Sequence, residues 1–257
     1  MKIKQLFDIR GKTALVTGGG QGIGKAICLA LAEAGANIII NYRSNHAEAE
    51  KTYREVLAYG VEAWLWKYDL NSETITADYN AFINNINKPV DILVLNASVQ
   101  IRKEWDQITL AEFNLQININ LRASLELIQC CAPGMKKNKW GRIVTLGSVQ
   151  QYRPNSQMTV YAASKMGQYN MVRNLAPQFA PYNITINNLA PGVIATGRNE
   201  DALSDIAYKE KIEKSIPLGF IGEATDVAPM ALLLCSEAGR YITGTDILVD
   251  GGMSLPG

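Results

Sequence analysis

The chain has 257 residues, of which 47% are hydrophobic and 19% charged, and its formal net charge is +1. This composition is that of a globular protein, and the near-neutral charge without basic runs argues against binding to nucleic acid or to an anionic membrane. There is no signal-peptide core, no apolar run of the ~20 residues that cross a bilayer, and no metal-ligand spacing among the four cysteines, so we expect a cytoplasmic protein with reduced thiols and no metal site.

The first apolar run, residues 13–17, is typical of a strand buried on both faces and leads directly into a glycine-rich turn over residues 18–24. The apolar helical pattern that follows ends at Gly35, which can cap it. Glycines suit this turn because they adopt positive φ and let a pyrophosphate approach the backbone, while the helix N-terminus offers unpaired N–H groups to the anion. The position of the turn between a strand and a helix predicts a dinucleotide site.

The second strand, residues 37–41, is followed by Arg43. An NAD-preferring site would carry an acidic residue here, about 20 residues beyond the glycines. A guanidinium at this place can pair with a 2′-phosphate. The sequence therefore favours NADP(H), with NAD(H) as the alternative if Arg43 is only a solvated surface residue.

Helical and strand patterns alternate along the rest of the chain. Helices are expected at residues 47–57, 74–86, 109–137, 157–180 and 225–236, and strands at 62–68, 90–95, 142–146, 183–189 and 246–250. This alternation predicts one α/β domain over residues 1–257, a doubly wound Rossmann fold whose mostly parallel seven-stranded sheet is covered by helices on both faces. Ligands of such folds bind at the carboxyl ends of the strands. Residues 193–223 are charged and lack a clear period, and we expect them to form a substrate lid.

Tyr161 and Lys165 are four residues apart in a segment whose alanines favour a helix, so their side chains should share a face. A cation beside a phenol lowers a pKa that is ordinarily about 10, which would let the pair exchange a proton at neutral pH. A buried tyrosine beside a snorkelling lysine would give the same spacing, so the context must decide.

Asn118 and Asn120 lie within a predicted helix, where asparagine needs either solvent or a specific partner. The only histidine, His46, lies in a polar stretch, which argues against a Ser-His-Asp triad.

These motifs resemble those of the short-chain dehydrogenase/reductase family, and the resemblance covers essentially the whole chain. The family pattern T-G-x-x-x-G-x-G matches the turn that starts at Thr17. The catalytic residues implied by the resemblance are Asn120, Ser148, Tyr161 and Lys165. The cofactor-binding residues implied are Thr17, Gly18, Gln21, Gly22, Ile23, Gly24, Arg43, Asp69, Leu70, Asn96, Ala97, Tyr161, Lys165, Pro191, Gly192, Val193 and Thr196. Two positions depart from the family pattern: Leu95 replaces an asparagine and Ser98 replaces a glycine, and we expect neither change to abolish activity.

The resemblance implies an NADP(H)-preferring oxidoreductase that moves a hydride between the nicotinamide and a carbonyl or secondary alcohol. Tyr161 would be the acid in reduction and the base in oxidation, and Lys165 would lower its pKa and hold the nicotinamide ribose. Ser148 would hydrogen-bond the substrate oxygen, and Asn120 would bind a water that links Lys165 to solvent. The resemblance also implies a homodimer or homotetramer built on the helices at 109–137 and 157–180.

The loops expected around the substrate are polar and partly cationic, with Gln150, Arg102 and Arg153 beside Ser148. They suit a sugar, a sugar acid or a polyol, and the sequence is most similar to the sugar and sugar-acid dehydrogenases of the family. A 3-oxoacyl thioester reductase is the alternative. A non-catalytic nucleotide sensor is an alternative of another class, but such a protein would not need the proton donor and its partners.

Overall fold

The computed structural model describes residues 2–255 and contains one seven-stranded sheet with the order β3-β2-β1-β4-β5-β6-β9. Its strands are β1 (Thr13–Val16), β2 (Asn37–Tyr42), β3 (Ala63–Lys67), β4 (Ile92–Leu95), β5 (Gly141–Leu146), β6 (Ile184–Pro191) and β9 (Asp246–Val249). Every pairing between these strands is parallel. The predicted doubly wound α/β fold is confirmed.

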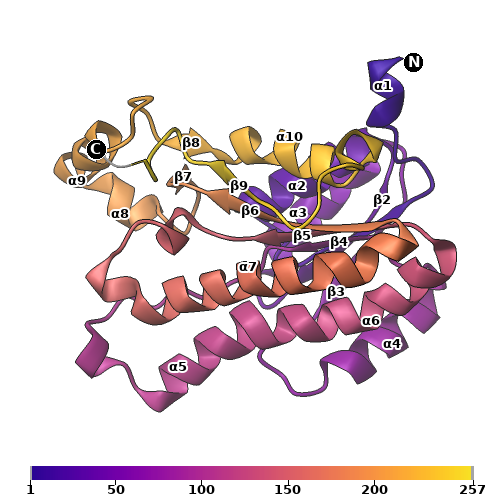
Figure 1. Ribbon diagram of the computed structural model, residues 1–257, viewed down its shortest axis with the longest axis horizontal. Coiled ribbons are helices and arrows are strands. Elements are labelled where there is room, and N and C mark those ends of the chain that lie inside the picture. Colours follow the sequence, from indigo (N-terminus) through magenta and orange to yellow (C-terminus); the bar gives the residue numbers. More distant parts are fainter. Residues whose placement is uncertain (1, 256–257) are drawn as a thin grey trace.

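Helices cover both faces of the sheet (Figure 1). One face carries α2 (Gly22–Glu33), α3 (His46–Leu57) and α10 (Ala224–Leu234), and the other carries α4 (Ile75–Ile86), α6 (Ala123–Asn138) and α7 (Thr159–Phe179). Side chains alternate along a strand, so β1 directs Ala14 and Val16 into the first core and Leu15 into the second. Because both faces of the sheet are covered, the central strands β1 and β4 are fully buried and form continuous apolar runs in the sequence.

The segment predicted as one helix over residues 109–137 is divided into three parts. Helix α5 (Leu110–Ile117) is followed by a π-helical turn, η2 (Asn118–Arg122), and then by α6. The prediction of one uninterrupted helix was wrong here. A π-helical turn inserts a residue between α5 and α6, but the two helices follow one another without a gap, so the apolar period does not reveal the insertion. Such π-helical turns are frequent at functional sites, and this one contains Asn120.

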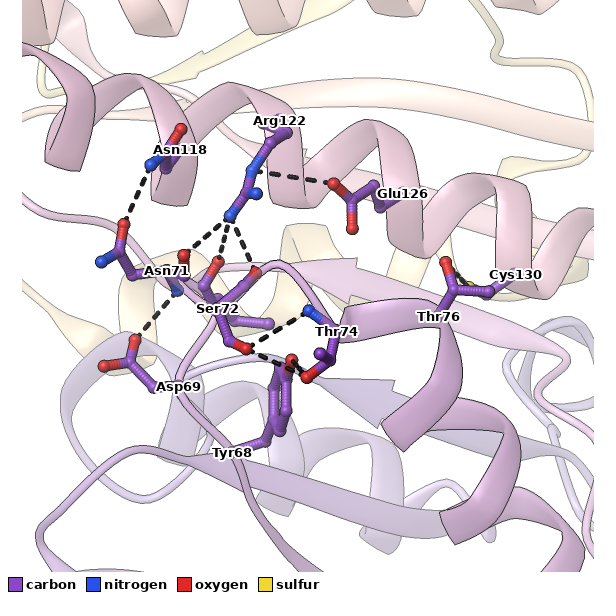
Figure 2. A network of polar contacts seen from close by, with 11 residues as sticks. Tyr68, Asp69, Asn71, Ser72, Thr74, Thr76, Asn118, Arg122, Glu126 and Cys130 are labelled. Carbon is purple, nitrogen blue, oxygen red and sulfur yellow. Dashed lines mark hydrogen bonds and ion pairs between the residues drawn. The ribbon is translucent and has the colours of Figure 1, made fainter.

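Polar contacts hold the π-helical turn against the loop that follows β3 (Figure 2). Arg122 Nη2 donates to the carbonyl oxygens of Asn71 and Ser72, each at 2.9 Å. Asn118 Nδ2 donates to Asn71 Oδ1 at 3.1 Å, and Asn71 N–H donates to Asp69 Oδ1 at 2.9 Å. The loop that begins at Asp69 is thereby fixed to the turn that carries Asn120.

The segment over residues 193–223 lies beyond one end of the sheet (Figure 1). It contains α8 (Glu200–Ser204) and α9 (Ile206–Lys214), and the two-residue strands β7 (Ile194–Ala195) and β8 (Gly222–Glu223) pair with each other at its ends. A separate short helix, α1 (Ile3–Leu6), precedes β1. Within residues 2–255, no helix combines the length and apolarity that crossing a membrane requires.

Candidate active site

The carboxyl ends of β1, β2, β4, β5 and β6 surround a cleft of about 670 Å³. The predicted site residues that line it are Gly18, Gln21, Gly22, Ile23, Gly24, Arg43, Asn96, Ala97, Arg102, Ser148, Gln150, Arg153, Tyr161, Lys165, Pro191, Gly192, Val193 and Thr196. Four predicted residues are not among its lining: Thr17, Asp69, Leu70 and Asn120. The structure thus brings the glycine turn, the tyrosine–lysine pair and the serine to one cavity.

The glycine turn has the geometry that an anion-binding helix start requires. Gly18 and Gly22 have φ values of +62° and +54°, where a side chain would strain the backbone. A Cβ at Gly24 would come within 2.2 Å of the Gly18 carbonyl oxygen, so only glycine lets α2 approach the turn so closely. The N-cap residue of α2, Gln21, makes no side-chain cap, which leaves the first N–H groups free to meet a ligand in the cleft. These residues fit the pyrophosphate of a dinucleotide.

Thr17 fixes the position of residues that line the cleft. Its hydroxyl oxygen accepts hydrogen bonds from the N–H groups of Asn96 at 2.9 Å and Ala97 at 3.0 Å. Asn96 Nδ2 in turn donates to the carbonyl oxygens of Thr17 at 2.9 Å and Gly18 at 3.1 Å. The two loops that follow β1 and β4 therefore hold each other in place.

Arg43 lies in a corner of the cleft with Tyr42, Ser44 and Asn45. Among the described residues that line the cleft there is no aspartate or glutamate, so Arg43 faces no competing carboxylate there. The Tyr42 hydroxyl is 2.7 Å from His46 Nδ1, which accounts for the histidine that the sequence left without a role. This corner fits the 2′-phosphate of NADP(H).

Lys165 is buried beside Tyr161, with its Nζ 5.8 Å from the centroid of the phenol ring. Nζ donates to the carbonyl oxygen of Leu146 at 2.6 Å and to Gln168 Oε1 at 3.0 Å. Burial lowers the pKa of Lys165 to about 7, and the positive charge of Arg198 acts in the same direction. The Lys165 side chain can therefore exchange a proton between its ammonium and amine forms near neutral pH.

Ser148 is held with its hydroxyl oxygen as an acceptor. Oγ accepts from the N–H of Gln150 at 3.2 Å, while the Ser148 N–H donates to Gln151 Oε1 at 2.8 Å. Asn188 Nδ2 and Asp246 Oδ2 fix Gln151 from behind, at 3.1 and 3.2 Å. With its acceptor side engaged, the hydroxyl keeps its proton to donate to an oxygen in the cleft.

Asn120 does not line the cleft, and its side-chain amide forms hydrogen bonds with other parts of the protein. Oδ1 accepts from the N–H of Val99 at 2.8 Å, and Nδ2 donates to the Val99 carbonyl oxygen at 2.9 Å and to Ser164 Oγ at 3.0 Å. This is the specific partner that a mid-helix asparagine required. The contacts fix the loop after β4 to α7, and the water linking Lys165 to solvent stays a prediction.

Cationic side chains line the part of the cleft that lies next to α9. Arg102 Nη2 donates to the Tyr208 hydroxyl at 3.3 Å, and Arg153 Nη1 donates to the carbonyl oxygens of Ser215 and Met253 at 3.3 and 3.2 Å. The two predicted arginines thus differ: Arg153 connects chain segments through main-chain oxygens, whereas the polar contact of Arg102 within residues 2–255 is to a neutral hydroxyl.

Sequence reasoning missed several residues of the cleft lining, among them Arg198, Tyr208 and Lys211. Arg198 Nη2 donates to the carbonyl oxygen of Ser98 at 2.9 Å, across the cleft. Arg198 comes only two residues after Thr196, so its distance from a predicted contact could have indicated it. Nothing in the sequence marks Lys211 apart from its neighbours Lys209 and Lys214, because all three lie in the same charged helix.

The chain is similar to known proteins along almost its whole length. A family model described as Enoyl-(Acyl carrier protein) reductase matches residues 18–254. The chain is 36% identical to the 3-oxoacyl-[acyl-carrier-protein] reductase of Aquifex aeolicus, over 96% of this chain and 99% of the relative. It is 34% identical to the L-rhamnose 1-dehydrogenase (NADP(+)) of Thermoplasma acidophilum, over 97% and 99% of the two chains. A crystal structure of a gluconate 5-dehydrogenase from Burkholderia cenocepacia, in complex with NADP and tartrate, superposes with a TM-score of 0.92 at 30% identity and covers all of both chains.

Proposed function

Because the chain belongs to the short-chain dehydrogenase/reductase family and is an oxidoreductase, we propose that it is an NADP(H)-dependent dehydrogenase of hydroxylated carboxylic acids of the sugar-acid type. The observation that carries this proposal is the charge of the cleft. Its substrate end holds Arg102, Arg198 and Lys211, and no carboxylate lines the cleft among the described residues. Cations without acidic partners favour an anionic ligand.

NADP(H) is supported by Arg43 and by the relatives. The relative from T. acidophilum is named for NADP(+), and the structure from B. cenocepacia holds NADP. Arg43 and the N–H groups at the start of α2 would hold the phosphates, and Asn96 and Thr196 would line the remainder of the cofactor's path. When bound, the nicotinamide supplies the hydride in reduction and accepts it in oxidation.

The chain's own residues move the proton. In reduction Tyr161 would donate its phenolic proton to the substrate oxygen, and in oxidation it would take that proton back. Ser148 would donate a hydrogen bond to the same oxygen and stabilise the negative charge that develops there. Lys165 would stabilise the phenolate through its positive charge and hold the ribose with the N–H that Leu146 and Gln168 leave free.

A sugar acid fits the two ends of the substrate site better than a neutral polyol does. Ser148 and Tyr161 would act at the carbinol carbon, and the carboxylate would lie against Arg102, Arg198 or Lys211. Gln150 would contact a neighbouring hydroxyl group. Arg153 is a weaker candidate for the carboxylate, because its guanidinium already binds two main-chain carbonyl oxygens.

A 3-oxoacyl thioester reductase is the second candidate. It is favoured by the relative from A. aeolicus, which is 36% identical to this chain along its whole length. The two candidates differ in the substrate group next to the reacting carbon. A sugar acid presents hydroxyl groups and a carboxylate there. An oxoacyl thioester presents an alkyl chain on one side and a neutral thioester on the other, and neither group carries a charge that the cations of the cleft could bind.

The test is a substrate panel with NADP(H) and NAD(H) in parallel: aldonates, the matching neutral aldoses and alditols, diketones, and 3-oxoacyl thioesters. We expect kcat/KM for an aldonate to exceed that of its neutral counterpart at least about tenfold, which corresponds to one hydrogen bond to a charged group. A thioester accepted better than every sugar derivative would favour the second candidate. No hydride transfer with any compound of the panel would contradict the proposal.

Two lysines on α9 offer a matched pair for the rim. Lys211 lines the cleft, whereas Lys209 lies outside it and pairs with Glu213 at 3.9 Å. We expect Lys211→Gln to raise KM for the aldonate several-fold and to leave KM for a neutral sugar unchanged, while Lys209→Gln changes neither. If Arg102→Ala, Arg153→Ala and Lys211→Gln all left every KM unchanged, the carboxylate site would be abandoned.

We also propose that the chain works as a homotetramer in the cytoplasm. The exposed apolar side chains include two groups of interest, one on and before α5 at Trp105, Leu110 and Phe113, and one near the edge strand β9 at Tyr241 and Leu248. Two separate apolar faces suit two kinds of contact, as a tetramer requires. The four free cysteines suit a reducing compartment. Light scattering of the purified protein would test the assembly: a monomer at micromolar concentration would contradict it.

A further inference from the structure

A chain of buried hydrogen bonds runs from the catalytic lysine away from the cleft. Gln168 lies on α7 one turn after Lys165 and is completely buried. Its Oε1 accepts from Lys165 Nζ at 3.0 Å, and its Nε2 donates to Ser124 Oγ at 2.7 Å. Ser124 Oγ then donates to the main-chain carbonyl oxygen of Asn120 at 3.1 Å. Side chains of α7 and α6 thus connect Lys165 directly to the π-helical turn.

The order of donors and acceptors in this chain is fixed. The Asn120 carbonyl can only accept, so the Ser124 hydroxyl uses its one proton there and presents a lone pair to Gln168. The amide of Gln168 must therefore turn its N–H group to Ser124 and its oxygen to Lys165. The opposite orientation would place an N–H donor against an ammonium, which has no acceptor to offer.

The surroundings of Lys165 give this oxygen its importance. No ion pair involves Lys165 among the described residues, and the guanidinium of Arg198 opposes its charge. The acceptors that stabilise the ammonium are the Leu146 carbonyl and Gln168 Oε1. An acceptor that binds the charged form opposes the effect of burial. These two acceptors engage two of the three N–H groups of Nζ, and the third would serve Tyr161 and the ribose.

We propose that Gln168 is a positioning residue of the reaction: it aims the Lys165 ammonium at Tyr161 and keeps it protonated in a site that offers it no carboxylate, with Ser124 fixing the amide. A neutral amide suits this task better than a glutamate would. A carboxylate at this place would also hold the ammonium, but its negative charge would oppose the ionisation of the neighbouring phenol. The inference concerns the family reaction and does not depend on which substrate is used.

The test compares two substitutions with opposite effects on the lysine. Gln168→Leu removes the acceptor at similar volume, whereas Gln168→Glu adds a negative charge beside Nζ. In the enzyme without cofactor, the 13Cε signal of Lys165 is followed against pH in 13C-lysine-labelled protein and assigned by its absence from Lys165→Arg. We expect the midpoint to fall by about one pH unit in Gln168→Leu and to rise by about one in Gln168→Glu.

The pH profile of kcat provides a second readout, because in the proposed reaction Tyr161 exchanges a proton beside the charge of Lys165. The whole profile should move toward acid pH in Gln168→Leu and toward alkaline pH in Gln168→Glu. The plateau of Gln168→Leu should also fall about tenfold, because part of the singly deprotonated enzyme would then hold a neutral lysine and a protonated phenol. Ser124→Ala, which frees the amide to rotate, should shift the profile in the same direction as Gln168→Leu but less.

The control is Gln178→Leu, an exposed position on the same helix whose amide donates to the Asn174 carbonyl oxygen. It should leave the titration and the profile unchanged. A purely structural role of Gln168 would lower activity in both variants without moving either midpoint, and that result would overturn the proposal. Shifts in the same direction in Gln168→Leu and Gln168→Glu would overturn it as well. If Gln168→Leu does not fold, an unshifted midpoint in Ser124→Ala together with Gln168→Glu decides against it.

Discussion

A cation is buried at each end of the parallel strands: one at their amino ends, here called the amino edge, and one at their carboxyl ends, the carboxyl edge. The two cations have different kinds of hydrogen-bonding partners. At the amino edge, Arg142 is fully buried and donates to the carbonyl oxygens of Ser236 and Asn183, and it pairs with Glu237 at 2.8 Å. At the carboxyl edge, Lys165 is equally buried but has two neutral acceptors and no carboxylate among the described residues. At the amino edge, the charge of Arg142 is therefore paired within the protein. The carboxyl edge still has N–H groups to offer to a ligand.

The aromatic and acidic neighbours repeat this difference. At the amino edge the indole of Trp140 contacts two cations, with Lys12 Nζ 4.0 Å and Arg142 Cζ 4.5 Å from its ring centroid. Asp91 beside them accepts from the Thr13 N–H at 3.1 Å, and burial raises its pKa. In the cleft, Arg43, Arg102, Arg198 and Lys211 form no ion pair with a carboxylate of the described residues. We therefore interpret these cations, which gather in one cleft, as the place where an anionic ligand binds.

The largest effect is expected from Lys165→Met, which should reduce kcat about 10³-fold because the phenolate loses its cation. The same change should raise the midpoint of thermal unfolding. Lys165 has a folded pKa of about 7 against about 10.4 unfolded, so the wild-type protein gains stability as pH rises between these values. The gain from Lys165→Met should therefore be larger at pH 6 than at pH 10. Equal gains at both pH values, measured by calorimetry, would contradict this origin.

Arg142→Met tests the opposite edge, and here stability should suffer while catalysis does not. Removing one partner of a buried ion pair costs 3–5 kcal/mol as a rule. We expect about 3 kcal/mol, because the Glu237 side chain is 39% exposed and regains water. Denaturant unfolding measures this loss. A fall in kcat per folded molecule comparable to that of Lys165→Met would show that the two edges are not as separate as we infer.

Arg43→Gln should weaken NADPH binding about 10- to 100-fold, the value of a lost hydrogen bond between charged groups, and leave NADH binding nearly unchanged. Binding can be followed by the fluorescence of the reduced cofactor. Arg54→Gln is the matched control, because Arg54 pairs with Glu50 on the exposed side of α3. Equal losses for NADPH and NADH would remove Arg43 from the 2′-phosphate site.

The smallest effect is expected from Ser98→Gly, which restores the residue of the family pattern. The contact from Arg198 uses the main-chain carbonyl of residue 98, and glycine retains it. We expect kcat/KM to change less than about twofold, well under the factor of ten that 1.4 kcal/mol would give. A larger loss would mean that the serine hydroxyl takes part in binding.

The sequence predicted the sheet well because its central strands are buried on both faces, and burial leaves a continuous apolar run such as Ile38 to Ile40. It predicted the cleft because a glycine turn, a strand end and a tyrosine–lysine pair must share the carboxyl edge of a parallel sheet. It did not predict the π-helical turn, since an inserted residue at Asn118–Arg122 leaves the apolar period on either side intact. It also gave no sign of Gln168, because its partner Ser124 lies 44 residues away and only the packing of two helices brings them together.

We propose that the cleft at the carboxyl edge both binds NADPH and turns it over through Tyr161. Tyr161→Phe separates these two properties, because it removes one hydroxyl group and keeps the ring. We predict that this variant binds NADPH with a Kd within about threefold of the wild type and loses at least about 100-fold in kcat with the best substrate of the panel. Turnover at the wild-type rate in Tyr161→Phe would contradict the account.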